Sequence, residues 1–151
     1  MSQVPPVPET LRFGGVILEF FQLSVGNPER GIVPAYHFQI LDLNSNKVGH
    51  LSFRVGDTEH IKLAAGHIGY EITEEHRGHS YAYQACLAAA PWIATRRASL
   101  LITADPDNAA SIRTIEKLGA TFLNEVDVPE NDPHHKRGSL RKRRYEWTPS
   151  L

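Results

Sequence analysis

The feature that most constrains the fold is a change of period in the middle of the chain. From Gly66 to Thr73 (GHIGYEIT) the apolar residues Ile68, Tyr70 and Ile72 recur at every second position, which places them on one face of a strand. From about Ser80 to Arg96 the small and apolar residues recur with helical spacing instead. The sequence therefore predicts a strand followed directly by a long helix that packs on a sheet.

Other elements are expected on both sides of this point. Runs of β-branched and aromatic residues predict strands at 16–25, 36–43 and 48–55, the last two forming a hairpin. Pro91 predicts a kink or a division of the long helix. A strand buried on both faces is expected at 100–103, a helix at 109–118 with Gly119 as its C-cap, and two antiparallel strands at 121–128 and 140–148. This order predicts an α/β (α+β) fold with a mixed, mostly antiparallel central sheet, splayed strands and helices on both faces.

Length and composition narrow the class of protein. The 151 residues suit a single domain over 1–151, in which the proline-rich residues 1–10 form a loose lead-in. The formal net charge of −1 favours neither nucleic acid nor an anionic membrane as partner. Cys86 is the only cysteine, so no intrachain disulfide is expected. The chain has neither a signal-peptide pattern nor an apolar run of about 20 residues. We expect a soluble, cytoplasmic protein.

The segment from Glu74 to Ala82 (EEHRGHSYA) joins the alternating strand to the long helix. A tight turn of small residues at that place leaves backbone N–H groups unpaired at the positive end of the helix, where they bind phosphate oxygens well. Arg77 adds a charge-assisted contact. Taken alone, the pattern also fits an ordinary turn.

This segment resembles the pyrophosphate loop of GNAT acetyltransferases, Gln/Arg-x-x-Gly-x-Gly/Ala, with Arg77, Ser80 and Ala82 at its three fixed places. Downstream, residues 108–120 (NAASIRTIEKLGA) are similar to the second signature of that superfamily, Asn-x-x-Ser/Ala followed by Glu-Lys-Leu-Gly-Phe. The resemblance covers roughly residues 34–148. It implies a GNAT-like fold with acetyl-CoA as co-substrate. It further implies an N-acetyltransferase that acts on a small-molecule or peptide amine by direct attack, without a covalent enzyme intermediate.

The resemblance also implies residue roles. The backbone of Tyr70 and Ile72 is expected to pair with the pantetheine arm, like an added strand. Asn108 and Ser111 are expected to contact the cofactor from the far side of the cleft, Asn108 being also a candidate N-cap. The backbone N–H groups expected to hold the pyrophosphate belong to Arg77, Gly78, His79, Ser80, Tyr81 and Ala82.

Three departures from the family pattern stand out. Ser80 replaces the first glycine of the loop, so that a Cβ crowds the phosphate while a hydroxyl becomes able to donate to it. Ile115 stands where many members carry a tyrosine as general acid. Only residues 26–34 separate the first two strands, so the usual acceptor-binding helices are shortened.

Acyl transfer to an amine needs a base for the amine and a proton for the departing thiolate. Glu71 and His67 share one face of the expected strand, opposite Ile68 and Tyr70, and are the candidate bases, acting directly or through water. The alternative for both is a solvated sheet edge or a satisfied polar pair. Tyr83, near the start of the long helix, is a candidate replacement acid, as is Tyr81, and both also fit packing roles. His37 and His50 lie on neighbouring strands whose register the sequence does not define.

Two polar segments remain. His134 and His135 lack the spacing of a zinc site, so no metal is expected. The basic run at 136–144 fits an exposed edge strand, and it also fits a site for the cofactor's 3′-phosphate, an acidic acceptor or RNA. Two alternative functions therefore stay open: a non-catalytic acyl-CoA-binding module, and an RNA- or ribosome-associated protein. The sequence does not identify the acceptor, and it leaves a homodimer open because superfamily members commonly dimerise.

Overall fold

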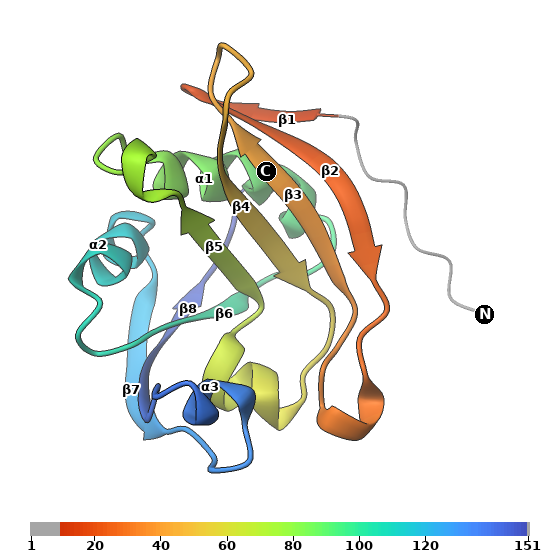
Figure 1. The fold of residues 1–151 in the computed structure, drawn as a ribbon, viewed down its shortest axis with the longest axis vertical. Helices are drawn as coiled ribbons and strands as arrows, with labels where there is room; N and C mark the ends of the chain where they lie inside the picture. The colour runs from red at the N-terminus through yellow and green to blue at the C-terminus, as the bar shows by residue number, and fades with distance from the viewer. Residues whose placement is uncertain (1–9, 151) are drawn as a thin grey trace.

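The structure is a computed structural model that describes residues 10–150 (Figure 1). The larger sheet is antiparallel, with strand order β1-β2-β3-β4-β5: β1 (Thr10–Phe13), β2 (Val16–Ser24), β3 (Ala35–Leu41), β4 (Lys47–Arg54) and β5 (Ile68–Ile72). The smaller sheet, also antiparallel, has the order β6-β8-β7: β6 (Leu100–Ala104), β7 (Thr121–Asp127) and β8 (Arg141–Trp147). The helices are α1 (Tyr81–Ala94), α2 (Ala109–Lys117) and α3 (Pro133–Lys136), and three short helical turns are η1 (Pro28–Arg30), η2 (Ile61–Ala65) and η3 (Glu74–His76).

Each strand and helix expected from the sequence has a counterpart, and the hairpin of β3 with β4 is confirmed. Helix α1 continues through Pro91 as one helix rather than two. Strand β6 is buried less completely than predicted, because Leu101 and Thr103 remain half-buried. The sequence missed β1, which begins at Thr10 within the expected lead-in; residues 1–9 of that lead-in lie outside the described part of the chain.

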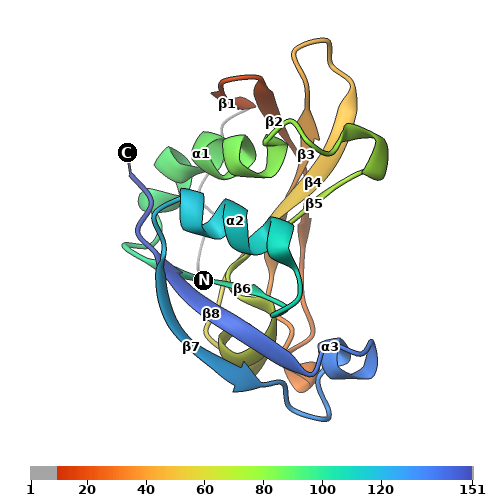
Figure 2. The ribbon, with the colours of Figure 1, turned by 90° about the vertical axis from the view of Figure 1, so that its left-hand side faces the viewer.

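The core lies between the larger sheet and α1. Trp92 of α1 meets the rings of Tyr36, Phe38 and Phe53 edge-on, with ring centroids 4.9, 5.5 and 5.5 Å apart. Small buried residues such as Ala89 bring the helix backbone close to the sheet. We call the sheet face that carries these rings the inner face. Figure 2 shows α1 and α2 on this same side of the larger sheet.

The two sheets meet at one joint and then diverge. The backbone N–H of His67, just before β5, donates to the carbonyl of Leu101 in β6 (2.8 Å), and the N–H of Leu101 donates to His67 Nδ1 (2.9 Å). Beyond this joint β5 is the edge of the larger sheet. The predicted splay of strands is therefore present (Figure 2). A cleft lies between β5 and α2.

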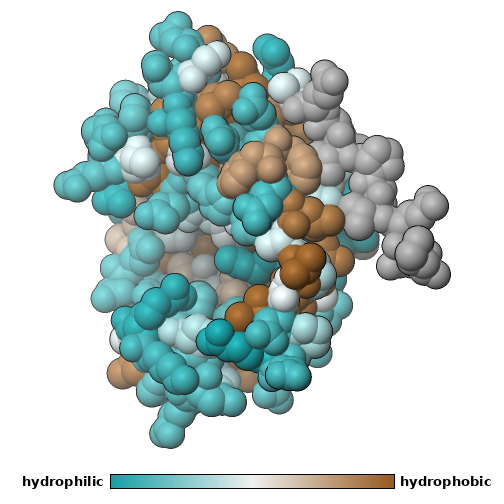
Figure 3. Space-filling view, turned by 45° about the vertical axis from the view of Figure 1, so that its right-hand side comes forward, coloured by the Kyte–Doolittle hydropathy of each residue, from teal (hydrophilic) through white to brown (hydrophobic). Residues whose placement is uncertain are grey.

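The outer face of the larger sheet points away from α1. His37 of β3 pairs in register with Ser52 of β4, and His50 of β4 pairs with Glu71 of β5, so these polar side chains share the outer face. Figure 3 shows this side of the molecule obliquely, with hydrophilic surface over much of it and a band of hydrophobic surface toward its right-hand side.

Candidate functional site

A cleft of about 660 Å³ lies between the free edge of β5, the start of α1 and helix α2. Its lining comes from Tyr70, Glu71, Ile72, Arg77, Gly78, Ser80, Tyr81, Ala82, Tyr83, Asn108, Ala110, Ser111, Arg113, Thr114 and Lys117. The cleft therefore brings together nearly all the residues that the sequence assigned to cofactor binding, from segments about 40 residues apart.

The open edge of β5 forms one wall. The N–H of Thr73 donates to Val48 (3.0 Å) on the β4 side, so the strand alternation turns the N–H and C=O groups of Glu71 to β4 and those of Tyr70 and Ile72 to the cleft. The carbonyl of Ile72 accepts a bond from Arg77 Nε (3.1 Å). This edge offers backbone groups to an extended ligand, which is the role expected for Tyr70 and Ile72.

The loop before α1 closes one end of the cleft. Ser80 adopts a left-handed conformation (φ 58°, ψ 30°), and its side chain forms no capping bond. The side chain of Gln84 donates to the carbonyls of His79 (3.0 Å) and Ser80 (3.2 Å) and accepts from the N–H of Gly15 (2.7 Å). The first N–H groups of α1 have no carbonyl partner within the helix, so they remain available at its positive end. No sequence pattern pointed to this role of Gln84.

Helix α2 forms the far wall. Asn108 accepts a bond from the N–H of Ser111 (3.1 Å), which confirms it as the N-cap. The hydroxyl of Ser111 lies 2.8 Å from that of Tyr70, so the two side chains bridge the cleft. Burial raises the pKa of Tyr70, which keeps this phenol protonated.

Positive charge gathers around the cleft. Arg77 of the loop and Arg113 and Lys117 of α2 line it, and Lys117 Nζ lies 4.3 Å from the ring centre of Tyr83. Sequence reasoning missed Arg113 and Lys117, although their four-residue spacing places them on one helix face. Three cations beside free N–H groups suit a ligand with several phosphates.

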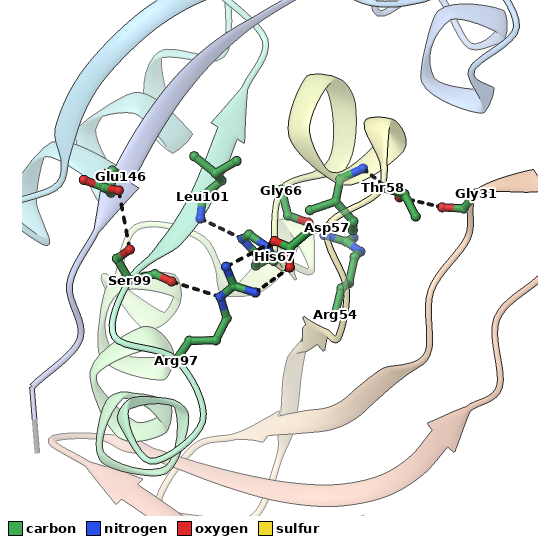
Figure 4. A network of polar contacts seen from close by, with 11 residues as sticks. Gly31, Arg54, Asp57, Thr58, Gly66, His67, Arg97, Ser99, Leu101 and Glu146 are labelled. Carbon is green, nitrogen blue, oxygen red and sulfur yellow. Dashed lines mark hydrogen bonds and ion pairs between the residues drawn. The ribbon is translucent and has the colours of Figure 1, made fainter. Parts of the chain in front are cut away.

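The structure separates the two candidate bases. Glu71 lines the cleft and is exposed, whereas His67 is 1% exposed and does not line it. Both ring nitrogens of His67 are engaged: Nδ1 accepts from Leu101, and Nε2 donates to Asp57 Oδ1 (3.0 Å), which also pairs with Arg97 (Figure 4). Burial lowers the pKa of His67 and keeps it neutral. This is a polar joint between β5 and β6, one of the alternatives left open for His67.

Four other residues considered in the sequence analysis do not line the cleft. His79 does not line the cleft, and its ring lies 5.3 Å from that of Tyr81. Ile115 is fully buried in the core. His37 and His50 bond to each other on the outer face, Nδ1 to Nε2, at 3.1 Å.

The basic run is largely engaged within the protein. Arg141 pairs with Glu125 and Asp127, Lys142 Nζ bonds to Asp105 Oδ1 (2.7 Å), and Arg144 Nε donates to the carbonyl of Lys62 (2.6 Å). Part of the run belongs to β8, which is the central strand of its sheet rather than the predicted edge. These contacts show that much of the positive charge of the run is used to hold β8 against neighbouring parts of the protein.

Within residues 10–150, no cluster of three His, Cys, Asp or Glu side chains is arranged to hold a metal ion. None of the helices in the same range has the length and apolar character needed to cross a bilayer.

Comparison with known proteins adds independent information. The family described as an acetyltransferase (GNAT) domain matches residues 15–121. No curated protein matched the sequence. Among solved structures, the fold is similar to a ribosomal-protein-S5-alanine acetyltransferase from Vibrio fischeri (19% identity, TM-score 0.59, covering 77% of this chain and 62% of that chain).

Two further structures show the same likeness. One is an acetyltransferase from Salmonella typhimurium that modifies the N-terminal serine of ribosomal protein L7/L12 (24% identity, TM-score 0.58, covering 77% of this chain and 64% of that chain). The other is a microcin C7 self-immunity acetyltransferase in complex with acetyl-CoA and AMP (18% identity, TM-score 0.56, covering 80% of this chain and 62% of that chain). The chain thus spans slightly less than two thirds of the length of these proteins. At these identities the likeness confirms the expected fold.

Proposed function

Since the chain belongs to the GNAT acetyltransferase family, we propose that it is an N-acetyltransferase that moves an acetyl group from acetyl-CoA to a primary amine. The observation that carries this proposal is the cleft itself. An open strand edge, the free N–H groups of a helix start and three cations lie along one continuous surface. That surface fits a ligand with an extended amide-bearing arm at one end and phosphates at the other.

Each group in the cleft receives a role in this proposal. The backbone of Tyr70 and Ile72 pairs with the pantetheine arm, and the N–H groups from Arg77 through Ala82 hold the pyrophosphate. Asn108 and Ser111 contact the cofactor from α2. Arg113 and Lys117, which line the same wall, add positive charge for its phosphates.

Acetyl-CoA supplies a thioester whose acyl carbon an amine attacks. The N–C bond that forms replaces the C–S bond that breaks, the amine gives up one proton, and the sulfur leaves as the free thiol of CoA. Glu71, exposed at the cleft, is proposed to take the amine proton. Tyr70, paired with Ser111 in the cleft, is the protonated hydroxyl proposed to serve the departing sulfur in place of the tyrosine that Ile115 replaces.

One alternative keeps specific support. Ile115 is buried, so the usual general acid is missing, and this favours a non-catalytic acyl-CoA-binding module as the second candidate. The RNA-binding alternative loses its main argument, because the arginines and the lysine of β8 contact the protein itself.

The test has two steps. Calorimetry should first show acetyl-CoA binding that weakens when Arg113 and Lys117 are both changed to Gln, with Arg12→Gln, on β1 outside the cleft, as the control. Thiol release should then be measured over a panel of amines that includes amino acids, polyamines and peptides; peptides belong there because two of the similar proteins are named for ribosomal-protein acetylation. Binding without turnover on any amine would favour the module.

A further inference from the structure

Arg54, at the end of β4, is a cation without an anionic partner in the described chain. Its Nη1 donates to the carbonyls of Ala65 (3.0 Å) and Gly66 (3.2 Å), at the end of η2 (Figure 4). The ion pairs found within residues 10–150 do not include Arg54. Carbonyl oxygens offset only part of the desolvation of a guanidinium, and a negative charge would match it better.

The guanidinium of Arg54 lies flat against the backbone of β5. A Cβ built on Gly69 would come within 2.6 Å of Arg54 Nη2, so glycine at this position makes room for the cation. Nε and Nη2 bond to no described residue, and neither belongs to the fully buried nitrogens without a partner, which are Trp92 Nε1 and Arg96 Nε. Both nitrogens therefore keep some contact with solvent, although most of the side chain is buried, and their shared edge is the one that holds a carboxylate through two parallel bonds.

A carboxylate stands on the same face two residues further along β5. The side chain of Glu71 points to the outer face, the side on which the Arg54 guanidinium covers Gly69, because strand residues two apart point the same way. Positions 69 and 71 are about 6.7 Å apart along the strand. Glu71 also lines the cleft, so it is the residue at which the outer face and the proposed cofactor site meet. Its negative charge acts on the neighbouring His50.

The groups between these two charges are uncharged near neutral pH. His50 and His37 bond to each other, and burial lowers the pKa of both, with Arg54 contributing to each shift. Ser52 completes this stretch of the outer face, its hydroxyl 3.1 Å from His37 Nδ1. Arg54 and Glu71 thus stand on one face, separated by neutral side chains. Two further cations act on this stretch, Lys47 on His50 and Arg137 on Arg54.

We propose that this outer face of β4 and β5 is the acceptor site, and that the acceptor is a small zwitterion of the amino acid type. The Nε–Nη2 edge of Arg54 holds the carboxylate of the acceptor, and Glu71 receives its ammonium group beside the cleft. This inference rests on the proposed function, since acetyl transfer is what brings an amine to Glu71. A polyamine or another purely cationic acceptor does not fit, because it would meet Arg54 without compensation.

The first experiment needs no variant. Thiol release from acetyl-CoA is measured with matched pairs, each an amino acid and its carboxamide, which carry the same side chain and differ in the carboxylate. The carboxamide has the more easily deprotonated amine, so chemistry alone favours it. We expect kcat/KM to be at least about tenfold higher for the acids, as befits a charge-assisted pair of hydrogen bonds. Equal or better turnover of the carboxamides or of polyamines would overturn the inference.

A variant then tests Arg54 itself. Arg54→Gln should lower kcat/KM for the acids about tenfold or more and bring the acid-to-carboxamide ratio toward one, and Arg54→Lys should recover part of that ratio. Arg144→Gln is the matched control, because Arg144 also donates to a carbonyl of η2 but lies on β8. If Arg54 only caps η2, its loss would lower stability and leave the ratio unchanged, which would refute the proposal.

The outcomes also separate the two proposals. Thiol release that favours uncharged or cationic amines would overturn the acceptor class and leave the N-acetyltransferase proposal standing. No thiol release with any amine would overturn both. Release that favours the zwitterions and loses this preference in Arg54→Gln supports both.

Discussion

His67→Phe should destabilise the protein without removing its chemistry. Phenylalanine keeps a ring in this buried position but leaves the N–H of Leu101 without an acceptor, which costs about 1–3 kcal/mol. The lost bond to Asp57 adds no more than about 1 kcal/mol, because that carboxylate is more than half exposed and keeps Arg97 as a partner. We therefore expect the free energy of unfolding to fall by about 2–3 kcal/mol.

The assay is urea unfolding near pH 7.5. With a slope of about 2 kcal/mol per molar urea, the midpoint should fall by about 1–1.5 M. Asp57→Asn is the matched control, since an amide oxygen still accepts from His67 Nε2 and the midpoint should change by less than about 0.5 M. A His67→Phe protein of unchanged stability that has lost acetyl transfer would refute this reasoning and restore His67 as the base.

Three further predictions concern other positions. Ser80→Gly should raise the free energy of unfolding by about 0.5–1 kcal/mol in the same urea assay, because it removes left-handed strain from a residue that makes no capping bond. This figure already allows for the opposing effect of glycine, whose unfolded state has more conformational entropy. A loss of stability would contradict the prediction. Gly49→Ala should lower the melting temperature markedly, at a cost of about 3 kcal/mol, because its Cβ would lie 2.2 Å from the carbonyl oxygen of Glu71. Stability should also fall as pH drops from 6.5 toward 4. Burial lowers the pKa of His134 to about 4 and also lowers the pKa of His67, so the unfolded chain binds more protons than the folded chain in this window. Above pH 6.5 these two groups should not change the urea midpoint.

Much of the architecture followed from periodicity alone. The alternation at Ile68, Tyr70 and Ile72 and the helical spacing after Ser80 located β5 and α1, and these two elements frame the cleft. The resemblance pointed to the loop from Arg77 to Ala82 and to the start of α2, and most of these residues line the cleft. Local patterns succeed where a residue's neighbours in sequence are also its neighbours in space.

What the sequence could not supply are contacts between distant segments. The assumption of a regular strand placed His67 on one face with Glu71, but Gly66 adopts φ 70° and ψ 175°, and His67 reaches across to β6 instead. Gln84 meets Gly15 across 69 residues. The guanidinium of Arg54 fits where it lies only because Gly69, on another strand, has no side chain. None of these depends on a pattern within one element.

The bond between Gln84 and Gly15 ties two distant parts of the chain energetically. Gly15 lies in the turn between β1 and β2, whereas the carbonyls that Gln84 also holds belong to the loop at the cleft. Local opening of that hairpin would release Gln84 and, with it, the fixed shape of the loop. By linkage, any ligand that binds only the ordered loop must stabilise the hairpin by the same free energy. The edge strand that sequence patterns overlooked is thereby coupled to occupancy of the site.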